Sequence, residues 1–286
     1  MSWIHTAVSV LILSSGLVAA PVDAAESYDN CTGFIDTVPA TISTQGTWCL
    51  RQDLATGIGT GNAITVTANN VTIDCNDFKL GGLAAGTDTN AQGIRSTAIS
   101  TTVRNCRVRG FRIGVALTSD YGLVENNRLD LNTRIGILTQ GDGAIIRRNT
   151  VLDTGGLPSG DARGIEADGP ANILDNTIIG VSASVAGNTS AIGIILFAGS
   201  LSASTIEGNR VRRLTPGGTG HRYGIYVPNS HVLVRGNGIM MTGAVAGDVG
   251  VQCSSPNIVT VDNVVVGWAA GAFSPGCVSG GGNAAP

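Results

Sequence analysis

The hexapeptide Val124-Glu125-Asn126-Asn127-Arg128-Leu129 returns 22 residues later as Ile146-Arg147-Arg148-Asn149-Thr150-Val151. Each copy has a hydrophobic residue, two variable residues, an Asn, any residue and a second hydrophobic residue. Further copies centre on Asn76, Asn176, Asn209 and Asn237, and weaker ones on Asn263 and on Cys106, where Cys replaces Asn. Eight copies of one unit indicate a repeat architecture.

A second unit, Gly followed by a β-branched residue, alternates with the first. It occurs as Gly93-Ile94, Gly114-Val115, Gly136-Ile137, Gly164-Ile165, Gly193-Ile194, Gly224-Ile225 and Gly250-Val251. From each Gly to the following Asn position the chain advances 13, 13, 13, 12, 16, 13 and 13 residues. From each Asn position to the next Gly, in contrast, the distance varies between 8 and 17 residues. Each repeat therefore has one segment of nearly constant length and one of variable length, and the shortest repeats have 21 or 22 residues. This pattern predicts an all-β, single-stranded right-handed parallel β-helix.

Stacked coils place equivalent residues above one another, so the repeat also predicts the core. We expect two inward rows, Ile94, Val115, Ile137, Ile165, Ile194, Ile225 and Val251 in one, and Phe78, Val108, Leu129, Val151, Ile178, Val211, Ile239 and Val265 in the other. The Asn positions should stack at one turn, in the left-handed backbone conformation that Asn tolerates. Outward residues Asp74, Arg104, Glu125 and Arg147 alternate in sign, which is typical of cross-strand pairing on a solvated sheet face.

The composition excludes several other classes of protein. The chain has 286 residues, of which 41 are Gly and 13% are charged, so it is neither a charged disordered chain nor a collagen. Seventeen basic against twenty acidic residues give a net charge of -3, and we expect no nucleic-acid partner. With only His5, His221 and His231, a His-rich metal centre is not expected.

The N-terminus and the cysteines predict an exported protein. An apolar run over 6–20 and a small-residue site before Ala25 are typical of a cleaved signal peptide at 1–24, after which we expect no membrane span. All six cysteines follow this segment, and an even number in an exported chain favours disulfides. Proximity suggests Cys31 with Cys49 and Cys253 with Cys277. We expect a cap at 25–62, coils at 63–270, and a cover with a flexible tail at 271–286.

The start of the mature chain resembles the exported right-handed parallel β-helix repeat proteins of bacteria, within the pectate-lyase-like superfamily. The resemblance rests on Cys31-Thr32-Gly33-Phe34-Ile35, Pro39-Ala40-Thr41-Ile42, Gly46-Thr47-Trp48-Cys49-Leu50, Ala63-Ile64-Thr65-Val66 and Asn70-Val71-Thr72-Ile73-Asp74-Cys75-Asn76. It implies the fold more firmly than an activity, because such proteins include lyases, hydrolases, epimerases, tailspikes and adhesins. The paired Asp residues of the polygalacturonase-like hydrolases are absent around Gly220-His221, as is the Asp-Pro-His segment of the alginate-type epimerases.

The variable loops precede the Gly-containing strand, so that strand should line a groove for an extended ligand. Within it, Arg163 or Arg222 could neutralise a uronic-acid carboxylate while His221 or Tyr226 transfers protons in a β-elimination. Arg112, Arg134, Glu166 and Tyr223 could bind substrate. The carboxylates of Asp161, Glu166 and Asp168 could hold calcium, the one cofactor that we consider.

The same residues also fit ordinary solvated loop and sheet charges. We therefore expect a secreted or periplasmic binding or structural protein that contacts polysaccharide along an outer sheet face. A polysaccharide lyase acting on a uronic-acid polymer and an adhesin or scaffold that contacts protein are the alternatives. The sequence leaves open whether the chain is an enzyme and what its oligomeric state is.

Overall fold

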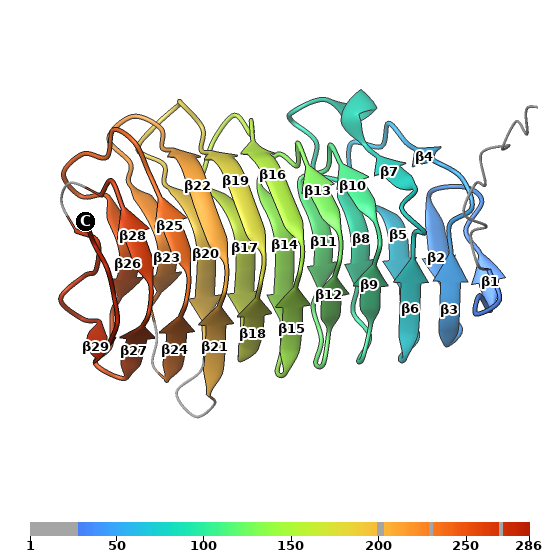
Figure 1. The fold of residues 1–286 in the computed structure, drawn as a ribbon. Coiled ribbons are helices and arrows are strands. Elements are labelled where there is room, and N and C mark those ends of the chain that lie inside the picture. Colours follow the sequence, from blue (N-terminus) through green and yellow to red (C-terminus); the bar gives the residue numbers. More distant parts are fainter. Residues whose placement is uncertain (1–27, 199–202, 229–230, 269–270) are drawn as a thin grey trace, which may run out of the picture.

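The computed structural model describes residues 28–198, 203–228, 231–268 and 271–286, and the predicted signal peptide lies outside them. Within this part the chain winds into a solenoid of three parallel sheets (Figure 1). Sheet A contains β1 (Gly33–Phe34), β3 (Gly46–Cys49), β6 (Val71–Asp74), β9 (Thr102–Arg104), β12 (Leu123–Glu125), β15 (Ala144–Arg147), β18 (Ala171–Leu174), β21 (Ser204–Glu207), β24 (Val232–Arg235), β27 (Ile258–Val261) and β29 (Val278–Gly281).

Each coil passes from sheet A to sheet C and then to sheet B. Sheet C contains β4 (Leu54–Ala55), β7 (Lys79–Gly81), β10 (Arg107–Arg109), β13 (Arg128–Asp130), β16 (Thr150–Gly155), β19 (Thr177–Ser182), β22 (Arg210–Thr215), β25 (Gly238–Met240) and β28 (Val264–Val266). Sheet B contains β2 (Ala40–Ile42), β5 (Asn62–Val66), β8 (Gln92–Ser96), β11 (Ile113–Leu117), β14 (Ile135–Gln140), β17 (Ala162–Asp168), β20 (Ala191–Phe197), β23 (Arg222–Val227) and β26 (Val249–Cys253). A 3-10 turn, η1 (Leu83–Ala85), follows β7. The predicted single-stranded right-handed parallel β-helix is thus confirmed.

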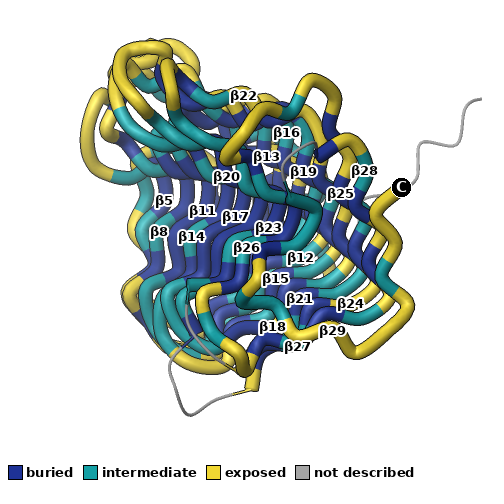
Figure 2. Tube along the Cα trace, turned by 90° about the vertical axis from the view of Figure 1, so that its left-hand side faces the viewer, coloured by how far each residue is buried: buried dark blue, intermediate teal, exposed yellow. Residues whose placement is uncertain are grey.

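The core is one continuous hydrophobic column inside the coils, and exposed residues lie mainly in the loops between sheets (Figure 2). The first predicted row is confirmed, because Ile94, Val115, Ile137, Ile165, Ile194, Ile225 and Val251 are in register on sheet B and fully buried. The second row is confirmed from Val108 onward. Phe78 was assigned to it wrongly, because Leu80 pairs with Val108 and Phe78 is only half-buried.

The predicted amide stack runs along the turn between sheets A and C. In this stack the Nδ2 of each Asn side chain donates to the Oδ1 of the Asn in the next coil, at 2.9–3.0 Å. The members, in order, are Asn127, Asn149, Asn176, Asn209, Asn237, Asn263 and Asn283. Asn76 lies outside this stack. The left-handed residue is not the stacked Asn but the residue before it, such as Arg148 with φ 55° or Asp175 with φ 55°.

A disulfide closes the N-terminal end of the amide stack. Cys106 donates its backbone N–H to Oδ1 of Asn127, and its sulfur is bonded to Cys75 of the preceding coil. The turn after Cys75 has two left-handed residues in succession, Asn76 and Asp77, which displaces Asn76 from the stack and Phe78 from the core row. The structure also contains the two disulfides predicted from proximity, Cys31–Cys49 and Cys253–Cys277.

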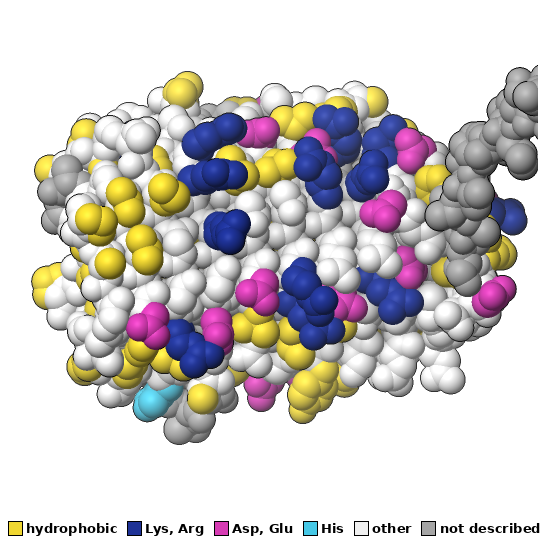
Figure 3. Space-filling view, viewed as in Figure 1, with side chains coloured by type: hydrophobic (Ala, Val, Ile, Leu, Met, Phe, Trp, Pro, Cys, Tyr) yellow, Lys and Arg dark blue, Asp and Glu magenta, His cyan; other side chains and the backbone are white. Residues whose placement is uncertain are grey.

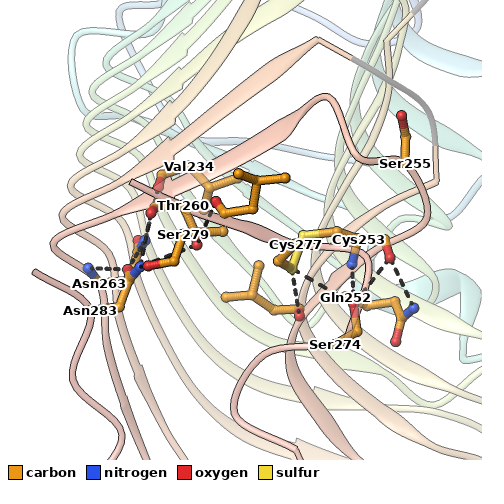
Figure 4. The surroundings of a disulfide bond; sticks show 12 residues. Val234, Gln252, Cys253, Ser255, Thr260, Asn263, Ser274, Cys277, Ser279 and Asn283 are labelled. Atoms are coloured by element: carbon orange, nitrogen blue, oxygen red, sulfur yellow. Dashed lines mark hydrogen bonds between the residues drawn. A yellow bond between two sulfur atoms is a disulfide. The ribbon is translucent and has the colours of Figure 1, made fainter. Parts of the chain in front are cut away.

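The first coil begins inside the segment expected to be a cap. Strands β2, β3 and β4 pair in parallel with β5, β6 and β7, so residues 40–55 already contribute to all three sheets. At the other end, β29 pairs with β27, and Asn283 accepts from Asn263 while donating to the carbonyl of Thr260 (Figure 4). The final residues therefore continue the sheet and the amide stack and are not the flexible tail that we expected.

The outer face of sheet A carries the alternating charges that the repeat predicts. Arg104 pairs with Asp74 at 2.7 Å, and Arg147 pairs with Glu125 at 2.7 Å. The pairs join neighbouring strands, which confirms cross-strand pairing on a solvated face. No helix in the described part of the chain is long and apolar enough to cross a membrane.

Candidate functional site

The candidate site lies on the outer face of sheet B, where β17, β20 and β23 are neighbours. Each strand bends at the Gly of the second repeat unit, so that this Gly and the residue after it both face the core. A Cβ on Gly164 would lie 2.6 Å from the carbonyl of Gly193 and 2.6 Å from Cγ2 of Ile178 in the second core row. The bend lets residues three positions apart, one on each side of it, point outward together.

Two short rows of outward side chains result from this bend. One row contains Arg163, Ile192 and Tyr223, and the other contains Glu166, Ile195 and Tyr226, in parallel register. The Tyr223 and Tyr226 rings are stacked, with centroids 5.2 Å apart and planes at 27°. These six residues are called the tyrosine face below.

Ionic side chains lie at the β17 end of the tyrosine face. Nη1 of Arg163 donates to Oε1 of Glu166, and the Glu166 residue is only 6% exposed. The second carboxylate oxygen of Glu166 and Nε of Arg163 are buried, and neither has a hydrogen-bond partner among the described residues. The Arg163–Glu166 pair therefore has hydrogen-bonding capacity that the described residues do not use.

Two of the predicted substrate-binding arginines lie near Arg163. Burial, and to a lesser degree the guanidinium groups of Arg112 and Arg163, lower the pKa of Arg134. Nη1 of Arg112 donates to Oδ1 of Asn90 in the preceding coil. The structure thus brings three of the predicted arginines together at the starts of β11, β14 and β17, where the carboxylates of Glu166 and Asp161 oppose their mutual repulsion.

Arg222 lies in a different environment from Arg163. Its Nη1 donates to the fully buried carboxylate of Asp248 at 2.6 Å, and its Nε donates to the carbonyl of Leu214 at 3.0 Å. Arg222 is in register with Ala191 and not with Arg163. Its guanidinium is therefore engaged within the protein and joins a loop to β23.

His221 lies beside the tyrosine pair. Its ring meets Tyr223 edge-on, with centroids 6.3 Å apart, and its buried Nδ1 has no hydrogen-bond partner among the described residues. Burial, followed by the nearby Tyr226 phenol, raises the pKa of Tyr223. At neutral pH the Tyr223 phenol is thus a neutral hydrogen-bonding group.

The three carboxylates considered for calcium do not converge. Glu166 faces Arg163, Asp168 accepts from Nε2 of Gln140 at 3.0 Å, and Asp161 accepts from the backbone N–H of Ser190 at 2.7 Å. In the part of the chain that the structure describes, no group of three or more His, Cys, Asp or Glu residues could hold a metal ion. We therefore derive no chemistry from calcium.

Loops between sheets C and B form a wall along the tyrosine face. They are linked across coils, as where Thr189 bridges Gly217 and where the backbone N–H of Thr219 donates to Oδ1 of Asn188 at 3.2 Å. A hollow of about 550 Å³ lies in this wall and is lined by Thr215, Pro216, Gly218, Thr219, Gly220, His221, Arg222, Val245 and Ala246. The hollow thus adjoins the start of β23, and the groove along the sheet remains a prediction.

Sequence reasoning missed the two isoleucines at the centre of the tyrosine face. Ile192 and Ile195 point outward, yet they are 3% and 2% exposed because they are flanked in both rows. Their positions on either side of Gly193-Ile194 match those of Arg163 and Glu166, and this match was the available signal. They add an apolar floor between the ionic and aromatic ends.

Comparison with known proteins supports the fold. The family described as "Right handed beta helix region" matches residues 55–196, and no curated protein matches the chain. Endopolygalacturonase I from Stereum purpureum, in complex with galacturonate, is 14% identical, with a TM-score of 0.55 over 89% of this chain and 96% of that one. That likeness shows a shared fold.

Two further solved structures are less similar. The Dettilon tailspike protein is 16% identical, with a TM-score of 0.47 over 87% of this chain and 56% of that one. The catalytic domain of a GH87 α-1,3-glucanase is 14% identical, with a TM-score of 0.47 over 88% and 64%. The family match and the three stacked parallel sheets together identify this chain as a right-handed parallel β-helix protein.

Proposed function

We propose that this protein binds a polysaccharide on the tyrosine face. The observation that carries the proposal is the outward stacked pair of Tyr223 and Tyr226 on β23, on the same sheet face as the ion pair of Arg163 and Glu166 on β17. Aromatic rings bind the apolar faces of sugar rings, while carboxylate and guanidinium groups hydrogen-bond to hydroxyl or acidic substituents. The tyrosine face offers both kinds of group within three adjacent strands.

The orientation of the ligand follows from the geometry of the coils. Side chains repeat at about 4.8 Å from strand to strand, so an extended chain that lies across β17, β20 and β23 meets equivalent positions in turn. Its sugar rings would contact Tyr223 and Tyr226 at one end and Glu166 and Arg163 at the other. The loop wall at 216–221 would limit its position sideways.

The place of action forms part of the proposal. Three disulfides, Cys31–Cys49, Cys75–Cys106 and Cys253–Cys277, are stable in an oxidising compartment. Polysaccharides are acted on or bound by proteins of similar fold, such as the endopolygalacturonase solved with galacturonate. We infer a secreted or periplasmic protein on these grounds.

A glycan array followed by calorimetry on the best ligand tests the proposal. The Y223A/Y226A variant should lose binding by about tenfold or more, because stacking on two rings is removed. The matched control is Y121A, which removes an exposed Tyr from a turn between sheets B and A. Equal losses in both variants, or full binding by Y223A/Y226A, would exclude the tyrosine face.

The same samples separate binding from cleavage. A lyase would release unsaturated products that absorb in the ultraviolet from alginate or polygalacturonate. Glu166→Gln and Arg163→Gln should then remove product formation while a binding signal remains. Binding with no product from any polymer of the panel supports a binding protein, as proposed here.

A further inference from the structure

The outer face of sheet C carries an unusual row of like charges. Lys79, Arg107 and Arg128 are in register on the adjacent strands β7, β10 and β13. Arg210 continues the same row on β22, and Arg109 and Arg212 belong to the neighbouring outward row. We call these six residues the basic face.

Sheet A shows that such a row is not a requirement of the fold. There the outward charges alternate in sign and form ion pairs, as between Arg104 and Asp74. Like charges directly opposite each other in a sheet are destabilising, so the basic face lowers the stability of the free protein. In Figure 3 basic side chains gather in two groups over sheet C with acidic side chains beside them, and over sheet A basic and acidic side chains lie next to each other.

Few carboxylates neutralise the basic face. Lys79 pairs with Asp53 at 2.9 Å, and Arg109 pairs with Asp130 at 3.2 Å. The other four members are exposed, and none forms an ion pair within 4.0 Å with a carboxylate of the described residues: Arg107, Arg128, Arg210 and Arg212. Because the whole chain has a net charge of -3, this excess of positive charge is local.

The surface of the basic face is hollowed at both groups. A depression of about 410 Å³ is lined by Asp53, Lys79, Arg107, Arg109, Arg128 and Asp130. A second depression, of about 280 Å³, lies beside Arg210 and Arg212 on β22. Five strand spacings separate β7 from β22, which corresponds to roughly 24 Å along the solenoid.

We propose that the basic face binds a linear acidic polysaccharide, with its carboxylate groups on the row that contains Arg107 and Arg128. Guanidinium groups bind carboxylates in bidentate fashion, and the adjacent strands β7, β10 and β13 present one cationic group about every 4.8 Å along this row. None of the nine sheet C strands carries an aromatic residue. Single-stranded nucleic acids are typically bound by stacking on aromatic side chains, so the carboxylated polymer fits better than nucleic acid.

This surface goes beyond the function proposed above, because it lies on a different sheet from the tyrosine face. The two faces belong to sheets B and C, and the six residues of one share no position with the six of the other. A chain held on sheet C could therefore remain bound while sheet B contacts another segment. The two proposals can fail separately.

Calorimetry with polygalacturonate of defined length, at low and physiological salt, tests the basic face. R107Q/R128Q should bind about tenfold or more weakly than the unmodified protein, because two charge-assisted contacts are lost. The matched control, R104Q/R147Q, removes the same charge from sheet A and should stay within about threefold. Circular dichroism verifies that every variant is folded.

Further probes separate the possible partners. Y223A/Y226A should retain the part of polygalacturonate binding that R107Q/R128Q removes, whatever happens on the tyrosine face. Oligo-dT of equal charge and phosphatidylglycerol vesicles should bind more weakly than polygalacturonate. Equal loss in R104Q/R147Q, unchanged binding by R107Q/R128Q, or tighter binding of oligo-dT or vesicles would overturn the proposal.

Discussion

The fully buried carboxylate of Asp248 accepts a hydrogen bond from Nη1 of Arg222 at 2.6 Å. Its oxygens also accept the backbone N–H groups of Arg222 and Val245, at 2.9 and 2.8 Å. This carboxylate therefore holds the loop before β26 against the start of β23. Removal of the guanidinium would leave a buried charge without its partner.

We expect Arg222→Ala to lower the free energy of unfolding by about 3 kcal/mol or more, since breaking a buried ion pair leaves an uncompensated charge. Denaturant unfolding followed by circular dichroism measures this loss. The control is Arg235→Ala, whose exposed pair with Glu207 should contribute at most about 1 kcal/mol. Similar losses in the two variants would show that the Arg222 pair is not structural.

The middle of the amide stack should be more sensitive to substitution than its end. Asn176 is fully buried, donates to the carbonyl of Ile146 at 2.9 Å and accepts two hydrogen bonds from Asn149. Asn176→Ala leaves these groups unsatisfied and should cost roughly 3 kcal/mol or more. Asn283→Ala, where water can replace the amide, should cost less, and urea unfolding compares the two. Equal costs would contradict a cooperative stack.

The glycine row should tolerate no side chain. Gly164→Ala places a methyl group 2.6 Å from both the carbonyl of Gly193 and Cγ2 of Ile178, so we expect a loss of about 1–3 kcal/mol or more. The thermal midpoint reports this change. Gly59→Ala has no atom within 4 Å of its new Cβ and serves as the neutral control. An unchanged thermal midpoint in Gly164→Ala would mean that the neighbouring strand and Ile178 can move away from the methyl group at little cost in free energy.

Tyr223 should make the fold sensitive to alkaline pH. Because its pKa is raised by burial, the folded chain retains a proton that the unfolded chain releases above about pH 10. Stability should therefore fall as the pH rises from the unfolded pKa through the folded one. Tyr223→Phe should lose less stability than the unmodified protein between about pH 9 and 11. The prediction would be refuted if an absorbance titration showed no tyrosine that ionises at higher pH than the others. It would also be refuted if Tyr223→Phe and the unmodified protein lost stability equally with pH.

The repeat predicted the core because one chain period determines both burial and register. Ile137 and Val151 lie where their positions in the unit place them. The prediction failed at Phe78, because the disulfide turn at Cys75 has a different backbone path from the amide turns. The sequence repeat cannot predict the position of a side chain that follows a turn of different backbone conformation, such as the turn at Cys75.

The site was less predictable than the core because its contacts depend on the variable arc. Arg163 and Glu166 lie three residues apart on one strand, so their contact can be predicted from the sequence spacing. Arg222 is instead held by Asp248, 26 residues later, at the end of the loop before β26. The basic face did have a signal, because Arg107, Arg128 and Arg210 each directly follow a stack position.

The hydrogen-bonded amides all point the same way along the solenoid, and the two ends of their row differ. Cys75–Cys106 ends it on one side, and Asn283 ends it on the other by donating to Thr260 and Ser279. The amide row is thus one directional chain of hydrogen bonds, in which each rung depends on the next. A duplicated rung of 127–148 inserted within the row would lengthen the solenoid by about 4.8 Å and add one more amide to that chain of hydrogen bonds.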